Sequence, residues 1–188
     1  MSVKIPVNTD RLIIREFSPN DWEAFHEYST QPDVLQFHKF SPESELDTRR
    51  FLDEIVASQS DLPRRRFEMA VTLKTDGQVI GGCGLYLLPR PDQAAIGYVL
   101  NRNFWGIGYA TEVAEALLRA AFTDMGIHRI STWCDTENTR SARVLEKIGM
   151  RREGHFVKDR WHTSKWRDSY SYAILEEEWT KRHSETGC

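Results

Sequence analysis

Cysteine is scarce in the sequence, where Cys83, Cys134 and Cys188 are the 3 cysteines among 188 residues. Their wide spacing, their odd number and the lack of any C-x-x-C pair argue against a disulfide framework and against a cysteine-based zinc site. Long apolar runs are also missing, and the N-terminal segment has no apolar signal core. We therefore expect a cytoplasmic protein with no membrane partner and no bound metal.

An excess of basic side chains is missing as well. The 25 basic and 28 acidic residues give a formal net charge of −3, which excludes a general electrostatic affinity for nucleic acid. The Walker A pattern G-x-x-x-x-G-K-[ST] does not occur, and this excludes a P-loop nucleotide site. The length suits one domain with a sizeable core, and no linker or repeat interrupts the chain. We therefore expect a single domain over residues 1–188.

Alternating apolar residues indicate β-strands joined by short turns in the middle of the chain. Strands are expected at residues 11–17, 67–74, 78–88, 94–100 and 128–134, with a closing hairpin around 156–161 and 169–175. The three strands between residues 67 and 100 are close enough in sequence to form an antiparallel meander.

Apolar residues at helical spacing predict helices around these strands. Helices are expected at residues 21–29, 41–59, 111–122 and 138–150. In the second helix, Ser41 is the expected N-cap and Pro42 the first helical residue, and Gly149 is expected to end the fourth. The run Arg64–Arg66 is expected in a solvated loop. This mixture of hairpin-joined strands and helices predicts an α+β fold.

Two glycines, Gly106 and Gly108, stand shortly before the third of these helices. Glycine tolerates positive φ and places no side chain between its backbone and an approaching group. A helix that begins there presents unpaired N–H groups and the positive end of its dipole, which together form a seat for a phosphate. A simpler interpretation is that the glycines only permit a tight turn from strand to helix.

The segment Gly106–Thr111 also resembles the dinucleotide-binding fingerprint, with Asp135 closing the next strand. That fingerprint requires a strand to run almost directly into the first glycine, whereas the bulky segment NRNFW intervenes here. The preceding strands are joined by hairpins, and the third small residue of the pattern is replaced by threonine. A nucleotide-dependent oxidoreductase is therefore the weaker hypothesis.

The order of a meander, a strand, a G-x-G turn, a helix, another strand and a helix beginning N-x-x-S resembles the GNAT acyltransferase family. The segments IGYVL, FWGIGYATEV and NTRSARVLEKIGMRREG are especially similar to its branch that includes ribosomal-protein alanine N-acetyltransferases. The resemblance runs from TDRLIIREF to RDSYSYAIL and implies a mixed, mostly antiparallel central sheet flanked by helices. It also implies that an acetyl group passes from acetyl-CoA to a primary amine by direct attack, the amine belonging to a protein N-terminus or a small molecule.

The resemblance also implies where the coenzyme binds. Its pyrophosphate would lie over the glycine turn, and its pantetheine arm would pair with exposed backbone of the strand that precedes the turn. The helix that follows Asn138 has a cationic flank, of which Arg143 is the candidate for the 3′-phosphate, although solvated surface is the simpler role. Asn138 itself is also a good N-cap. The coenzyme-binding residues expected on these grounds are Val99, Leu100, Gly106, Ile107, Gly108, Tyr109, Ala110, Thr111, Asn138 and Arg143.

Ser141 is the candidate catalytic residue next to the coenzyme sulfur. It shares one helix face with the apolar Val144, Leu145 and Ile148, and so faces inward. Such a serine often bonds its own helix backbone. The N-x-x-S pattern of the family implies instead that the hydroxyl contacts the sulfur and supplies a proton or a hydrogen bond to the departing thiolate.

The general base is less well defined by the sequence. Many members of the family carry a carboxylate at the position that Ala95 occupies here. Glu68, on the minority face of an apolar strand, is the candidate substitute, while a solvated strand-end carboxylate is its simpler role and a water chain is another route for the proton. Because Ala95 carries no carboxylate, a non-catalytic acyl-CoA-binding or sensing protein on the same fold remains the alternative.

Overall fold

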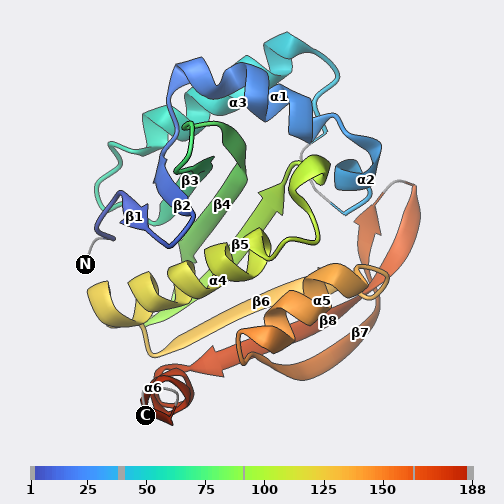
Figure 1. Cartoon of the computed structure of the whole chain (residues 1–188). Helices are drawn as coiled ribbons and strands as arrows, with labels where there is room; N and C mark the ends of the chain where they lie inside the picture. Colours follow the sequence, from blue (N-terminus) through green and yellow to red (C-terminus); the bar gives the residue numbers. More distant parts are fainter. Residues whose placement is uncertain (1–2, 38–40, 91, 163, 186–188) are drawn as a thin grey trace.

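The structure, a computed structural model, describes residues 3–37, 41–90, 92–162 and 164–185. It is built around an eight-stranded sheet with the order β1-β2-β3-β4-β5-β6-β8-β7 (Figure 1). Neighbouring strands are antiparallel except for β5 and β6, which are parallel. The strands are β1 (Val7–Asn8), β2 (Leu12–Glu16), β3 (Arg66–Leu73), β4 (Val79–Leu87), β5 (Gln93–Leu100), β6 (Arg129–Asp135), β7 (Arg151–His162) and β8 (Lys165–Leu175). The expected α+β fold with a mixed, mostly antiparallel sheet is confirmed.

Helices cover both faces of the sheet. They are α1 (Trp22–Ser29), α2 (Pro32–Leu35), α3 (Glu45–Ser58), α4 (Tyr109–Arg119), α5 (Thr139–Lys147) and α6 (Glu176–Glu185), with short helical turns η1 (Pro19–Asp21), η2 (Arg102–Phe104) and η3 (Ala120–Asp124). Consecutive residues of β3 point to opposite faces. Met69 and Val71 belong to the core cluster under α4, whereas Ala70 packs with Phe25 of α1 and Leu52 of α3. Figure 1 shows α4 and α5 on one side of the sheet and α1 and α3 on the other.

The start of α3 differs from the expected one. The helix begins at Glu45, and Ser44 is its N-cap because the Ser44 hydroxyl accepts a hydrogen bond from the Asp47 N–H at 3.2 Å. Ser41 and Pro42 lie in the irregular segment before it. The prediction of an N-cap at Ser41 was therefore wrong, because Ser44, which directly precedes the helix, takes that role.

The expectation that the arginine run forms a solvated loop is confirmed only in part, since Arg64 and Arg65 lie in a loop and Arg65 and Arg66 are exposed. Arg64 forms a bidentate ion pair with Glu16, with N–O distances of 2.6 and 3.0 Å, and its side chain is only 15% exposed. Arg66 is the first residue of β3 and bonds Glu68 on the same strand. The partner of Arg64 lies 48 residues away on β2, so the local sequence does not reveal it, whereas the partner of Arg66 lies two residues away on the same strand.

The helix α6 was not predicted. Three consecutive acids, Glu176, Glu177 and Glu178, occupy its first turn, where they favour a helix through its dipole. Cys83 and Cys134 are buried free thiols, and Cys188 lies outside the described residues. Among the described helices, none is long and apolar enough to cross a bilayer.

Candidate active site

Strands β5 and β6 diverge along part of their length, and we call the region between their separated ends the β5–β6 cleft. Their parallel pairing ends at Ala95 and Ser131, although both strands continue beyond that point. The last link between them is the Thr132 hydroxyl, which donates to the Ile96 carbonyl at 2.8 Å. Figure 1 shows the two strands separating towards the ends that lead into η2 and α5.

The backbone of β5 presents hydrogen-bonding groups to this cleft. The Asn101 N–H donates to the Ile80 carbonyl of β4. Because hydrogen-bonded pairs alternate along an antiparallel ladder, the N–H and C=O of Val99, two residues earlier, also point to β4. Those of Tyr98 and Leu100 point to the cleft. The Leu100 carbonyl accepts from the Trp105 indole N–H at 2.8 Å. The Leu100 N–H has no acceptor in the described part of the chain.

The glycine turn lies at the end of the same cleft, next to α4. Gly106 has a φ of 82° and Gly108 a φ of 90°, and both residues are exposed. A Cβ at Gly106 would meet nothing within 4 Å. The first hydrogen bond of α4 joins the Glu112 N–H to the Gly108 carbonyl at 3.1 Å. The N–H groups of residues 106–111 have no acceptor among the described residues, so the turn is open to an anion.

A brace from the N-terminal strands holds this turn. Glu112 accepts hydrogen bonds from the Thr9 hydroxyl at 2.6 Å, the Arg11 backbone N–H at 2.8 Å and the Arg11 Nε at 2.7 Å. Arg11 also donates from Nη1 to the Ile107 carbonyl at 3.0 Å. Burial raises the pKa of Glu112, but the hydrogen bonds from Thr9 and Arg11 outweigh it and hold the pKa below its ordinary value. Sequence analysis did not find this brace.

We expect Glu112→Gln to destabilise the fold by about 1 kcal/mol at neutral pH, because it removes a charge-assisted contact that solvent partly screens. Since the pKa of Glu112 is lowered by folding, its contribution is complete above the ordinary value of 4.5 and disappears as the pH falls through the lowered pKa. Urea unfolding of both proteins across this pH range measures the difference. A difference that stays constant with pH would show that the Glu112 charge contributes nothing.

Ser141 lies beside the cleft on the first turn of α5. Its hydroxyl is 3.2 Å from the Tyr98 hydroxyl, and Asn138 caps the helix by accepting the Ser141 N–H at 3.1 Å. The simpler role considered for Asn138 is therefore what the structure shows. Burial raises the pKa of Tyr98 to about 12, so this phenol stays protonated at neutral pH. Tyr98 is a neighbour of Ser141 that the sequence did not indicate.

The cationic flank of α5 reaches the glycine turn through Arg140. The Arg140 guanidinium lies 5.1 Å from the ring centre of Trp105, the residue directly before Gly106. Arg143 is exposed and lies about one helical turn further along α5. Both arginines therefore lie on the same helix, and Arg140 is the one that contacts Trp105.

Glu68 faces the side of the sheet that is opposite α4. Its side chain is 14% exposed and accepts hydrogen bonds from Arg66 at 3.1 Å and from the Tyr86 hydroxyl at 3.2 Å. The register places Glu68 beside Gly84, and Gly84 beside Gly97 of β5. The Tyr86 ring lies over Gly84, where any Cβ would collide with it. Glu68 is thus a partly buried, hydrogen-bonded carboxylate and is not the solvated one considered above.

A small pocket lies on this same face, beyond the end of β6. Its volume is about 230 Å³, and its walls come from the segment after α2, from β6 and from the β7–β8 hairpin. Asp135 lies in its floor, where it accepts from the buried Arg167 Nε at 2.6 Å and from the Glu137 N–H at 2.8 Å. Asp135 therefore serves an internal ion pair, which contradicts a role as the ribose-binding acid of a dinucleotide site.

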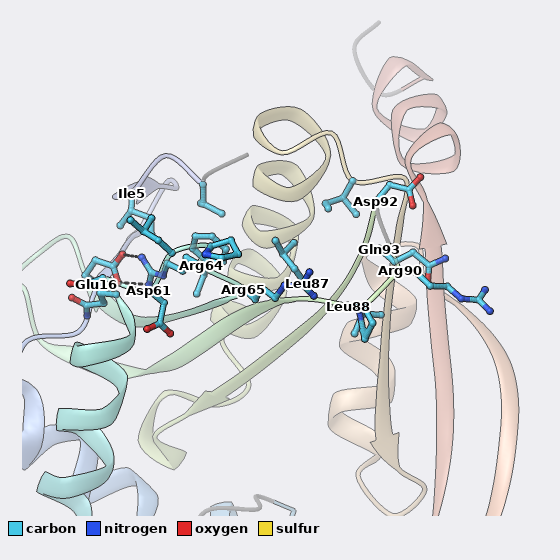
Figure 2. A pocket seen from close by; sticks show the side chains of 18 residues that line it. Ile5, Glu16, Asp61, Arg64, Arg65, Leu87, Leu88, Arg90, Asp92 and Gln93 are labelled. Carbon is cyan, nitrogen blue, oxygen red and sulfur yellow. Dashed lines mark hydrogen bonds and ion pairs between the residues drawn. The ribbon is translucent and has the colours of Figure 1, made fainter.

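A larger hollow of about 810 Å³ lies at the opposite end of the sheet (Figure 2). It is bordered by the start of β5, the end of β4 and the loop before β3, and the ion pair of Arg64 with Glu16 crosses one side of it. None of the residues predicted for coenzyme binding or catalysis lines it. The candidate site therefore remains the β5–β6 cleft.

Comparison with known proteins agrees with this geometry. The family model described as "Acetyltransferase (GNAT) domain" matches residues 11–151. The chain belongs to the GNAT acetyltransferase family and is an N-acetyltransferase.

Its relatives include the Uncharacterized N-acetyltransferase YnaD of Bacillus subtilis, which is 38% identical over 92% of this chain and 98% of that protein. The crystal structure of a GNAT-family acetyltransferase from Bacillus anthracis has a TM-score of 0.81 and 38% identity, covering 91% of this chain and 98% of that one. The ribosomal L7/L12 α-N-protein acetyltransferase RimL, solved with coenzyme A, has a TM-score of 0.80 at 20% identity, covering 91% and 97%. This last similarity shows the fold alone.

Proposed function

We propose that this N-acetyltransferase uses acetyl-CoA and transfers the acetyl group directly to a primary amine of a small molecule or a protein N-terminus. The observation that carries the proposal is the open glycine turn, where the N–H groups of residues 106–111 have no acceptor among the described residues. The turn adjoins a cleft with a protonated hydroxyl pair on one side. RimL, which has the same fold, was solved with coenzyme A bound.

In this proposal the residues of the turn, from Gly106 to Thr111, donate their N–H groups to the pyrophosphate. Leu100 and Tyr98 offer their backbone to the pantetheine arm, while Val99 supports the strand from the β4 side. Arg143 and its neighbour Arg140 provide positive charge for the 3′-phosphate. Asn138 contributes by holding the first turn of α5, and with it Ser141, at the cleft.

The chemical step forms a C–N bond and breaks the thioester C–S bond. The Leu100 N–H is placed to stabilise the negative charge that develops on the carbonyl oxygen. Tyr98 and Ser141 share a hydrogen bond and provide the proton that the departing thiolate takes up. Because a phenol is a stronger acid than an alcohol, Tyr98 is the source of the proton and Ser141 the group that carries it to the sulfur.

Glu68 is the proposed general base, which takes a proton from the ammonium form of the amine before attack. The proton that the nitrogen loses after attack replaces the one that Tyr98 gives up. Glu68 acts through the Tyr86 hydroxyl or an intervening water, because two strands separate Glu68 from the cleft. Gly84 and Gly97 put no side chain across this path. Tyr86 keeps its proton between transfers, since burial and the nearby Glu68 both raise the pKa of Tyr86.

We expect Glu68→Gln to lower kcat/KM by about 10- to 100-fold at neutral pH, the range typical of losing a general base that acts through a relay. The loss should shrink as the pH approaches the pKa of the amine, because the amine then arrives already neutral. A pH profile of kcat/KM for both proteins measures this. An equal loss at every pH would mean that Glu68 only supports the strand.

The proposal is tested by incubating the protein with acetyl-CoA and a panel of amines while following thiol release. Release that depends on an amine supports transfer. Stabilisation by coenzyme A in a thermal unfolding assay, without thiol release from any amine, would instead support the acyl-CoA-binding alternative that the missing carboxylate at Ala95 suggests. Stabilisation by NAD and not by coenzyme A would contradict both.

A further inference from the structure

Arg160 is an arginine whose hydrogen-bonding capacity is partly unused. Its guanidinium stacks 3.3 Å above the Trp133 ring centre and lies 3.5 Å from the carboxylate of the adjacent Asp159. Its Nε is buried and makes no hydrogen bond to the part of the chain that the structure describes, while 31% of the side chain is exposed. Leaving a desolvated donor without an acceptor is costly, so such a group is expected to have a partner in the working protein.

The other charged side chains of the pocket have closer polar partners, although the buried Arg167 Nη2 also makes no hydrogen bond to the described residues. Arg167 bonds Asp135 at 2.6 Å and lies 3.0 Å from a carboxylate oxygen of Glu137. Both carboxylate oxygens of Asp159 accept from the Ser169 hydroxyl, at 2.8 and 2.9 Å. The guanidinium of Arg160 is therefore the cation in this pocket that lacks a hydrogen-bonded anion among the described residues.

The pocket lies on the side of the cleft from which the acceptor amine would approach. Cys134 belongs to the core on the α4 and α5 side of the sheet, so its neighbours Trp133 and Asp135 face the opposite side. The register aligns Trp133 with Gly97 across the open part of the cleft, since Ala95 pairs with Ser131 two residues earlier. A coenzyme seated against α4 and α5 leaves this side of the cleft for the acceptor.

We propose that Arg160 binds a carboxylate of the acceptor, so that the amine to be acetylated belongs to a molecule that also carries a carboxylate. This inference rests on the proposed acetyl transfer and names its substrate class. A guanidinium stacked on an aromatic ring presents its edge to a planar carboxylate in a two-point contact. The 230 Å³ volume is smaller than that of sites for drug-sized ligands and suits one amino-acid residue.

The carboxylate can belong to a free amino acid or to an acidic residue at the start of a peptide. Both sources share the chemistry that Arg160 recognises, and they differ in whether the chain continues beyond the first residue. A polyamine such as spermidine offers only cations to this arginine. We therefore expect it to be a poor acceptor.

The test compares Arg160→Gln with the matched variant Arg152→Gln. Arg152 also stacks on an aromatic ring, at 4.6 Å from the centre of Tyr170, but on the side of the sheet that faces α5. The probes are free amino acids, their C-terminal amides, amidated peptides with an N-terminal aspartate or glutamate, and spermidine. For each acceptor, thiol release from acetyl-CoA gives kcat/KM.

We expect the wild type to prefer carboxylate-bearing acceptors over their amides, and Arg160→Gln to reduce this preference by about 10- to 100-fold through KM. Arg152→Gln should keep the wild-type preference. A stronger response to free amino acids or to acidic peptides identifies the source of the carboxylate.

An unchanged preference in Arg160→Gln, or faster acetylation of amides and spermidine than of carboxylate-bearing amines, would overturn the inference and leave acetyl transfer intact. Thiol release with no amine at all would overturn the proposed function as well.

Discussion

Replacement of Gly106 by valine is expected to weaken coenzyme A binding by about 100-fold or more while the protein still folds. The turn is proposed to hold a pyrophosphate through N–H groups that have no acceptor among the described residues. Each charge-assisted hydrogen bond of this kind contributes about 1.5–3 kcal/mol, so the loss of two of them reaches this magnitude. A side chain at Gly106 both shifts the backbone and occupies the space into which the phosphate would move.

The control is Gly77→Val, at the turn between β3 and β4. Gly77 has a φ of 75° and open space where a Cβ would stand, closely matching the φ of 82° and the open surroundings of Gly106. The backbone strain of a β-branched residue at positive φ is thus the same in both variants, about 1–3 kcal/mol. Calorimetric titration with coenzyme A and thermal unfolding measure affinity and stability separately. Equal affinities in the two variants, at equal stability, would contradict the phosphate seat.

The second large effect is expected on kcat when either hydroxyl of the Tyr98–Ser141 pair is removed. We expect Ser141→Ala and Tyr98→Phe each to lower kcat by about 100-fold, with the coenzyme A Kd changed by less than about 3-fold, because the pair is proposed to act after binding. The double variant should lose little more than either single variant, since two groups that pass one proton act as a unit. Initial-rate kinetics and titration of all three proteins measure this.

Additive losses in the double variant would show that the two hydroxyls act separately. Full turnover in Ser141→Ala would leave Ser141 only a structural role on α5. The proposed role of Tyr98 as the proton source also sets the pH above which the rate should fall. With the pKa of Tyr98 raised to about 12, no loss of rate from its ionisation is expected below pH 10, about two pH units under that value.

The parts of the site that sequence analysis found depend on local chemistry. The glycines at 106 and 108 are needed because the chain takes positive φ there, and this requirement belongs to each residue by itself. The N-cap at Asn138 is local in the same way. The start of α3 was missed because Ser41 and Ser44 both offer a capping hydroxyl, and only Ser44 has a suitably placed backbone N–H at Asp47.

The remaining parts depend on contacts between distant segments. Glu112 meets Thr9 and Arg11 only because α4 packs beside the edge formed by β1 and β2. The hairpin of β7 and β8 is longer than expected. Its length was underestimated because β7 is an edge strand with most of its residues exposed, and its sequence therefore shows no clear apolar alternation. Its contribution to the pocket around Arg160 was therefore not visible in the sequence.

The pocket walls and the phosphate turn come from separate stretches of the polypeptide. The turn is built by residues near 106 and braced from the N-terminal strands, whereas residues 159–162 and Arg167 of the β7–β8 hairpin line the pocket. Exchange of these hairpin residues for others should therefore redirect the choice of amine while donor affinity is kept. In evolution and in protein engineering alike, such a chain can gain a new acceptor through changes confined to one hairpin.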